Sequence, residues 1–158
     1  MVVADLPAGS TVQVVNVTSG AVATTTTPFN TDDTIPQKTE GGEFMTLAIT
    51  PTNSSNKLLI QVRVVGAYST GSSNTCALFQ DTTANALAST QHYQATTNTT
   101  TALGLNHYMV AGTTSETTFK VRGGGNGGSN TFTFNGISAG RIHGGVHSSS
   151  ITITEIKV

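Results

Sequence analysis

Apolar and polar side chains alternate along most of the chain with a period of two. In the clearest stretch, 57–68, leucine, isoleucine and valine fill the even positions 58–64, and Gln61 and Arg63 face the other way. This is the pattern of a strand with one buried face. No window shows the 3.6-residue period of an amphipathic helix, so the sequence predicts an all-β protein.

Nine stretches are predicted to be strands, and turn-forming residues lie between them. Short strands at a spacing of roughly 8 to 16 residues are typical of a β-sandwich or jelly roll. Parallel α/β folds are excluded because no crossover helix is available. The nine stretches are Thr11–Val17, Phe44–Ile49, Lys57–Tyr68, Thr75–Gln80, Ala86–Gln94, Leu103–Ala111, Thr117–Arg122, Thr131–Asn135 and Ile151–Val158.

The length of 158 residues predicts a single antiparallel β-sandwich domain spanning 1–158. Residues 1–10 are expected to form a short N-terminal arm. Residues 21–42 hold a threonine run, two prolines and three of the eight acidic residues, so they are predicted to be a long excursion over the surface.

The surface is expected to be polar but nearly uncharged. Only 9% of the residues are charged, against roughly 25% in ordinary soluble domains, whereas the chain has 30 Thr, 14 Ser, 11 Asn and 17 Gly. A net charge of −1 without a basic cluster in the sequence excludes nucleic acid and anionic membranes as expected partners. No apolar run is long enough for membrane insertion, and Met1–Gly9 lacks the basic start of a signal peptide, so synthesis in a cytoplasm is expected.

Low charge leaves the edges of a β-sheet poorly protected. Exposed edge strands are usually blunted by lysine or other charges, and this chain has few. We therefore expect edges or faces to be buried in a homo-oligomer.

Two strings match enzyme sequence motifs, but the flanking residues lack what each motif requires. Residues 136–140 spell G-x-S-x-G, yet the only acid after Ser138 is Glu155, and no histidine follows that acid. A glycine-framed β-turn is predicted instead. Residues 123–128 match G-x-G-x-x-G, but a strand rather than a helix is predicted to follow. We predict no enzymatic activity and no cofactor.

The candidate metal ligands are sparse. His143 and His147 are spaced i and i+4, but Gly144 and Gly145 between them favour a loop. No metal site is predicted, and a solvated or intersubunit hydrogen-bonding role is expected for the two histidines. Cys76 lies in an apolar run and is expected to be a small buried hydrophobe.

Two glycine-rich loops, Gly123–Asn130 and Gly140–His147, are the candidate contact surfaces, because glycine permits backbone shapes closed to other residues. A reading of both as plain hairpin connections stays open. Tyrosines are the available carbohydrate-stacking groups, since the chain has no Trp. The candidate partner-contact residues are Asn126, Asn130, His143, His147, Tyr93 and Tyr108.

Several strings resemble a family of bacteriophage virion proteins, called tail-fibre or minor structural proteins. The strand series and the closing "SITITEI" also resemble the jelly roll of tumour necrosis factor and the complement globular head. The strings are "TVQVVN" (11–16), "DTIPQKTEGGEFMTLAITPTNSSNKLLIQVRV" (33–64), "CALFQDTTANALA" (76–88), "HYMVAGTTSETTFKVR" (107–122), "TFTFNG" (131–136) and "SSSITITEIKV" (148–158).

The resemblance implies a homotrimeric knob on a virion, at the tip of a fibre or spike, next to other virion proteins and in reach of a host surface glycan or protein. Two alternatives stay open. One is a capsid or tail decoration protein without receptor binding, and the other is a small glycan-binding module.

Overall fold

A computed structural model describes residues 6–158, which form strands and one short 3-10 helix. The strands are β1 (Thr11–Ser19), β2 (Ala23–Thr25), β3 (Gly42–Ile49), β4 (Lys57–Tyr68), β5 (Ser72–Gln80), β6 (Ala88–Gln94), β7 (Thr100–Val110), β8 (Thr117–Gly125), β9 (Phe132–Phe134), β10 (Gly136–Ile137), β11 (Gly140–Arg141) and β12 (Ser149–Ile156). The 3-10 helix is η2 (His143–Gly145).

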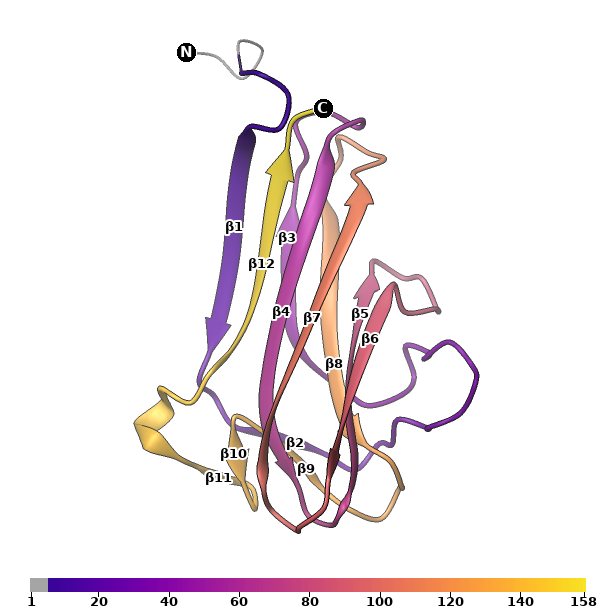
Figure 1. The fold of residues 1–158 in the computed structure, drawn as a ribbon, viewed down its shortest axis with the longest axis vertical. Coiled ribbons are helices and arrows are strands. Elements are labelled where there is room, and N and C mark those ends of the chain that lie inside the picture. Colours follow the sequence, from indigo (N-terminus) through magenta and orange to yellow (C-terminus); the bar gives the residue numbers. More distant parts are fainter. Residues whose placement is uncertain (1–5) are drawn as a thin grey trace.

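Eight long strands form two antiparallel layers (Figure 1). One layer has the order β1-β12-β4-β7, and the other has the order β3-β8-β5-β6. When the eight strands are renumbered along the chain, these orders become 1-8-3-6 and 2-7-4-5, the arrangement of a jelly roll. The predicted fold class is therefore confirmed. The number of copies in an assembly stays a prediction.

The alternation read from the sequence fills the space between the two layers. Leu58, Ile60, Val62 and Val64 of β4 are buried there, while Gln61 and Arg63 face outward. The opposing layer contributes the inward side chains of β3, β5 and β8. Cys76 is fully buried as expected, and burial raises the pKa of its thiol to about 12.

All nine predicted strands are present, with ends shifted by a few residues. The short strands β2, β10 and β11 were missed, since two or three residues carry no readable period. The prediction of a loop from Gly123 was wrong, because β8 continues to Gly125. A Cβ on Gly125 would lie 2.5 Å from the Tyr68 ring, so this glycine allows close packing rather than a turn.

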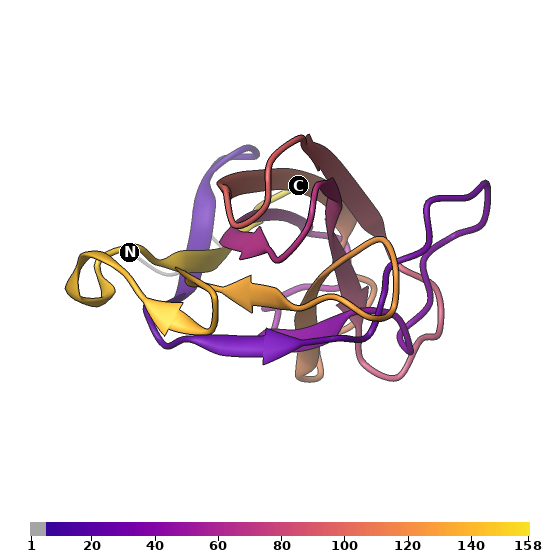
Figure 2. The ribbon, with the colours of Figure 1, turned by 90° about the horizontal axis from the view of Figure 1, so that it is seen from below.

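Residues 21–42 form the predicted excursion, but they are more than a loop. They contain β2, which pairs with β9, and they bury Phe29 against Ala77 and Phe79 of β5. Arg122 holds the end of the excursion by donating to the carbonyl oxygens of Glu40 (2.8 Å) and Gly41 (2.7 Å). The excursion thus covers part of the outer face of the β3-β8-β5-β6 sheet and then projects sideways (Figures 1 and 2).

The predicted N-terminal arm is only partly visible, because residues 1–5 lie outside the described residues. Its remainder lies against the C-terminus, where Gly9 donates to the Lys157 carbonyl (2.8 Å) and the Lys157 amide donates to Ser10 (2.9 Å). The two ends of the described chain are therefore joined beside β1 and β12.

Glu155 is a fully buried carboxylate at the end of β12. It accepts hydrogen bonds from Gln13 Nε2 (2.6 Å), Asn56 Nδ2 (2.6 Å) and the amide and hydroxyl of Thr52 (2.9 and 2.8 Å). Burial alone raises the pKa of Glu155, but these hydrogen bonds outweigh it and hold the pKa below the ordinary value.

The first prediction concerns Phe29. Phe29→Ala removes the side chain that fixes the excursion, and we expect a loss of about 3 kcal/mol in the free energy of unfolding. Urea denaturation gives this value, and limited proteolysis should show cleavage within 26–41. Ile35→Ala is the matched control, since Ile35 is 54% exposed. Equal stability of both variants would contradict the packing role.

The second prediction concerns acid stability. Because the pKa of Glu155 is lowered in the folded state, its contribution is present above the unfolded value of about 4.3 and is lost as pH falls through the folded value. We expect Glu155→Gln to be less stable than the wild type at pH 7 by about 1 to 3 kcal/mol. The difference should shrink between about pH 5 and pH 3. Thermal melts across this range measure it, and a difference independent of pH would refute the assignment.

Candidate functional site

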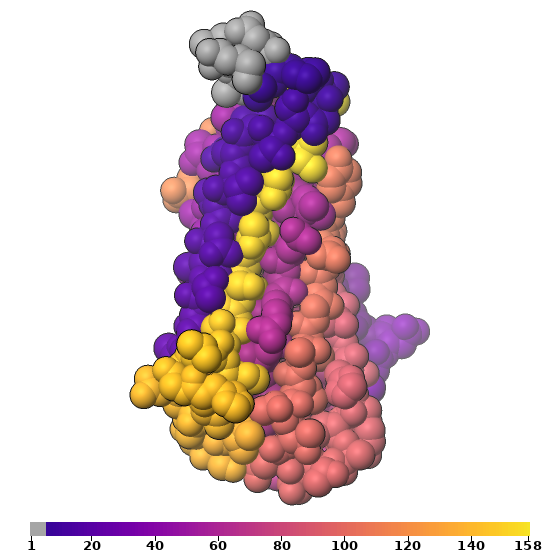
Figure 3. Space-filling model, turned by 60° about the vertical axis from the view of Figure 1, so that its left-hand side comes forward, coloured from indigo at the N-terminus to yellow at the C-terminus, as the bar shows by residue number. Residues whose placement is uncertain are grey.

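No segment of residues 6–158 covers the outer face of the β1-β12-β4-β7 sheet. Figure 3 shows its four strands side by side. The inward residues of these strands pack in the core, so their alternate residues point away from it. We call this surface the bare face.

One end of the bare face, near the two termini, is apolar. Strand register places Val14, Thr154, Leu59 and Tyr108 in one row across the sheet. Val14 is 56% exposed and Tyr108 is 58% exposed. In the next row Val110 of β7 stands opposite Lys57. Val110 extends the apolar end to the edge of the sheet.

Farther along the strands, the face becomes polar. One row contains Asn16, Thr152, Gln61 and Asn106, so three side-chain amides lie across the four strands. Asn16 donates to the Thr152 hydroxyl (2.8 Å), and this hydrogen bond orders the part of the row on β1 and β12. The sheet here offers amide donors and acceptors to the solvent.

The following row contains Thr18, Ser150, Arg63 and Gly104. A Cβ placed on Gly104 would meet only the Val62 carbonyl oxygen, at 3.8 Å. On β7, beside Arg63, the surface therefore has open space where the other strands carry side chains.

Residues 136–148 project from the lower end of the sandwich in Figures 1 and 3, and they contain β10, β11 and η2. The two ends of this segment are clamped together, because Ser149 Oγ donates to Asn135 Oδ1 (2.7 Å). The Val65 amide donates to the same hydroxyl (2.9 Å), and Asn135 Nδ2 reaches the Ser19 carbonyl (2.7 Å). A compact loop with joined ends is an Ω-loop, a type that is frequently functional.

The backbone of this loop is unusual. Asn135, Ser138, Ala139 and His143 all have positive φ without being glycine. Ser138 and Ala139 form the two-residue connection between β10 and β11, with φ of 50° and 61°, as a type I′ hairpin turn requires. The predicted β-turn at this G-x-S-x-G string is therefore confirmed.

Four nitrogen-bearing side chains lie in or beside this loop. The His143 and His147 rings are 6.0 Å apart, and Arg63 Nη1 donates to the Ser148 carbonyl (2.5 Å). The Arg141 side chain lies beside Gly145, which stands between the two histidines in the chain, since a Cβ on Gly145 would be 3.7 Å from Arg141 Nη1. We call Arg63, Arg141, His143 and His147 the basic corner. The expectation of no basic cluster holds for the linear sequence only, since the fold gathers residues from two distant segments.

No carboxylate neutralises this corner within residues 6–158, where the single ion pair joins Arg122 to Glu43. Burial, with the charges of His143 and Arg63, lowers the pKa of His147. The Nε2 atom of His147 is buried and has no hydrogen-bond partner among the described residues. The corner therefore holds unpaired positive charge and one unsatisfied polar atom.

The six predicted contact residues do not form one site. His143 and His147 meet in the basic corner, whereas Asn126 and Asn130 belong to the loop between β8 and β9. Tyr93 is 67% exposed near the end of β6, and Tyr108 lies near the end of β7, which runs in the opposite direction. Sequence reasoning missed Arg63 and Arg141, because neither stands in a basic run.

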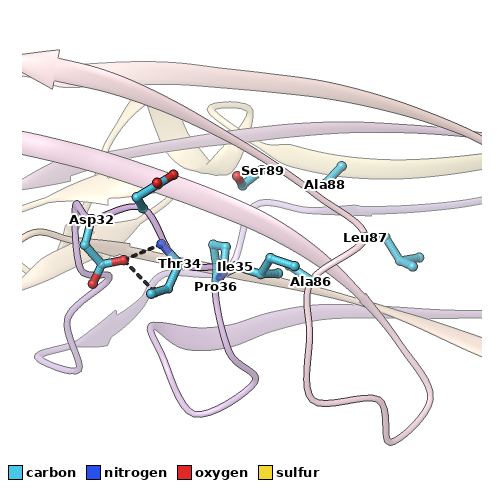
Figure 4. A pocket seen from close by; sticks show the side chains of 9 residues that line it. Asp32, Thr34, Ile35, Pro36, Ala86, Leu87, Ala88 and Ser89 are labelled. Atoms are coloured by element: carbon cyan, nitrogen blue, oxygen red, sulfur yellow. Dashed lines mark hydrogen bonds between the residues drawn. The ribbon is translucent and has the colours of Figure 1, made fainter.

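A shallow pocket of about 410 Å³ lies between the excursion and the start of β6 (Figure 4). Its lining mixes apolar residues, among them Ile35, Pro36 and Leu87, with polar ones. Hydrogen bonds from the hydroxyl and amide of Thr34 hold the pKa of Asp32 below its ordinary value. Asp32 is thus engaged in a local turn, and the pocket contains none of the predicted contact residues.

Among the described residues, no three His, Cys, Asp or Glu side chains are grouped as a metal site would require. In the same part of the chain, no helix is long and apolar enough to cross a bilayer.

No family model and no curated protein matches the chain. Solved structures with a similar fold include the sugar-binding C-terminal domain of EclA (13% identity, 72% of this chain and 73% of that chain, TM-score 0.42). A CBM36-1 domain of a multidomain xylanase from the hindgut metagenome of Trinervitermes trinervoides is 10% identical, and the match covers 89% of this chain and 96% of that chain with a TM-score of 0.39. A structure of infectious bursal disease virus, Gx strain, is 12% identical, and the match covers 93% of this chain and 33% of that chain with a TM-score of 0.38.

The similar structures thus include sugar-binding and viral proteins. With TM-scores below 0.5, these likenesses assign neither family nor function to the chain.

The third prediction tests the clamp under the Ω-loop. Ser149→Ala leaves the Val65 amide and Asn135 Oδ1 without this partner, and we expect a loss of about 1 to 3 kcal/mol. Hydrogen exchange should accelerate in 136–148. Ser150→Ala is the control, since Ser150 faces outward on the same strand. If exchange in the loop is equal in the two variants, the clamp does not hold the loop.

Proposed function

We propose that this protein is a subunit of a homotrimeric virion spike or fibre tip, exposed on the particle surface. The observation that carries the proposal is the bare face of a jelly roll with very little charge. Apolar side chains at one end of this face are exposed in the single chain. Packing against a neighbouring copy removes them from water.

The distribution of charge favours a particular kind of contact. The bare face carries Lys57 and Arg63 and no outward carboxylate, since Glu155 points into the core. Two copies of this face packed against each other would bring like charges together. A head-to-tail contact, in which the bare face of one copy meets a different surface of the next, avoids that repulsion and closes into a ring.

The acidic residues needed for such a contact lie elsewhere on the molecule. They are Asp32, Asp33 and Glu40 in the excursion, Glu43 on β3, and Asp81 and Glu116 in loops. The contact is made at the apolar end of the bare face, and the polar rows farther along the strands stay outside it.

The sequence resemblance to phage virion proteins supports the setting on a particle. A disulfide-free, largely antiparallel fold also suits a protein that must persist outside cells, where the rate of unfolding matters most. A decoration protein without receptor binding uses the same fold and contacts. Blocking of phage adsorption by the purified protein separates the two roles.

The fourth prediction is the assembly state. Light scattering after size exclusion should give three times the 16.2 kDa chain mass at micromolar concentration. Tyr108→Lys adds charge to the apolar end of the bare face, and we expect at least a tenfold weaker association. Thr97→Lys is the control, since Thr97 is exposed in the loop between β6 and β7.

A wild-type monomer would overturn the trimer, and equal association of both lysine variants would overturn the role of the bare face. If antibodies against the protein fail to label intact phage particles, the virion assignment fails, whatever the assembly state.

A further inference from the structure

We propose that the basic corner is a binding site for a carboxylate- or sulfate-bearing saccharide. The charged group would be held by Arg141, His143 and His147 with Arg63, and the sugar hydroxyls by the polar rows of the bare face. The inference rests on the proposed surface exposure for its biological setting only. Binding is tested on the purified protein, so a failure here leaves the role in the virion intact.

The corner has the chemistry of an oxyanion site. Arginine guanidinium groups match carboxylate and sulfate oxygens with paired donors. Arg141 is exposed, and its side chain makes no hydrogen bond or ion pair among residues 6–158, so its guanidinium donors are available. Arg63 donates one hydrogen bond to the Ser148 carbonyl, and this contact orients the guanidinium toward the loop.

The backbone of the loop is strained. His143 has a φ of 49° and is followed by Gly144 and Gly145, both with positive φ. Non-glycine residues with positive φ are found mainly where the surrounding structure enforces them, and they gather at functional sites. Here the strained turn places the two imidazoles 6.0 Å apart on one side of the loop.

The adjoining surface explains why a saccharide fits better than a free anion. Next to Arg63, Gly104 leaves open space on β7, and the row of Asn16, Gln61 and Asn106 follows along the strands. Amides both donate and accept, as sugar hydroxyls do. Successive rows on the same face are about 6.6 Å apart, because they are separated by two strand residues. One sugar unit therefore reaches from the charged corner to the amide row.

The apolar end of the bare face, assigned above to the neighbouring copy, does not overlap this site. Leu59 and Arg63 are four residues apart on β4, which separates the two regions by about 13 Å. The strands run along this separation, so assembly at one end leaves the basic corner exposed at the other.

The test uses isothermal titration calorimetry at pH 6 with three probes: sodium sulfate, a galacturonic acid trisaccharide and the uncharged galactose trisaccharide. We expect the acidic trisaccharide to bind most tightly. Arg141→Gln should lower the affinity for this trisaccharide about tenfold, as expected for the loss of a charge-assisted hydrogen bond. Lys120→Gln makes the same charge change on β8 and should leave binding unchanged.

A second variant separates the sugar contact from the charge contact. Gly104→Val puts a side chain into the open space on β7 but alters no charge, so we expect it to weaken binding of the acidic trisaccharide and to leave sulfate binding unchanged. Circular dichroism and thermal melts verify that each variant is folded. In NMR titrations, the bound anion should raise the pKa of His147 by stabilising the imidazolium.

Equal binding of the acidic and uncharged trisaccharides would overturn the oxyanion site. Sulfate binding without preference for the acidic trisaccharide, or an unaffected Gly104→Val, would overturn the saccharide assignment. If Arg141→Gln and Lys120→Gln bind the acidic trisaccharide with equal affinity, Arg141 does not hold its carboxylate, and the assignment to the basic corner is overturned.

Discussion

Strand β12 is the element on which the rest of the structure depends, because it is hydrogen-bonded on both sides and β1 pairs with it alone. Its inward positions are Ser149, Ile151, Ile153 and Glu155, all fully buried. A shift of register by one residue would turn all four toward solvent. The two isoleucines fix the strand in the core, while the polar ends reach partners that only one register offers. Thus the same strand ties down the loop 52–56 at one end and the Ω-loop at the other.

The two sheets are covered unequally, and this asymmetry gives the molecule distinct surfaces. β5 is buried on both faces, because Phe29 from the excursion packs on the side that faces away from the core. The β1-β12-β4-β7 sheet has no such cover. In a chain with 9% charged residues, an uncovered sheet with an apolar end is poorly protected from other molecules. A surface of this kind is better explained as a contact than as a solvated face.

The alternation of β4 predicted its position and both of its faces, because its neighbours in the sheet leave one side in the core and the other in water. The run from Cys76 to Phe79 indicated a buried strand, but not that Phe29 covers its second face. That contact joins residues about fifty positions apart, and no local pattern encodes it. Gly123 and Gly125 were predicted to begin a loop on composition alone. They continue β8 because aromatic rings pack where side chains would stand. The basic corner was not predicted because it is also a non-local contact: seven strands lie in the chain between Arg63 and the two histidines.

A recognition loop must be exposed and yet hold its shape, and the Ω-loop meets both demands through its anchor. Asn135 and Ser149 are fully buried, so the clamp works in a dry environment where a hydrogen bond is strong and its loss is costly. The strained residues Ser138, Ala139 and His143 lie beyond that anchor, outside the core, where they do not disturb the packing. If three copies pack around an axis along the strands, three basic corners lie at the same end of the assembly. Each corner alone offers a weak contact of two arginines and two histidines, but three joined sites bind a repeating saccharide with the gain of effective concentration.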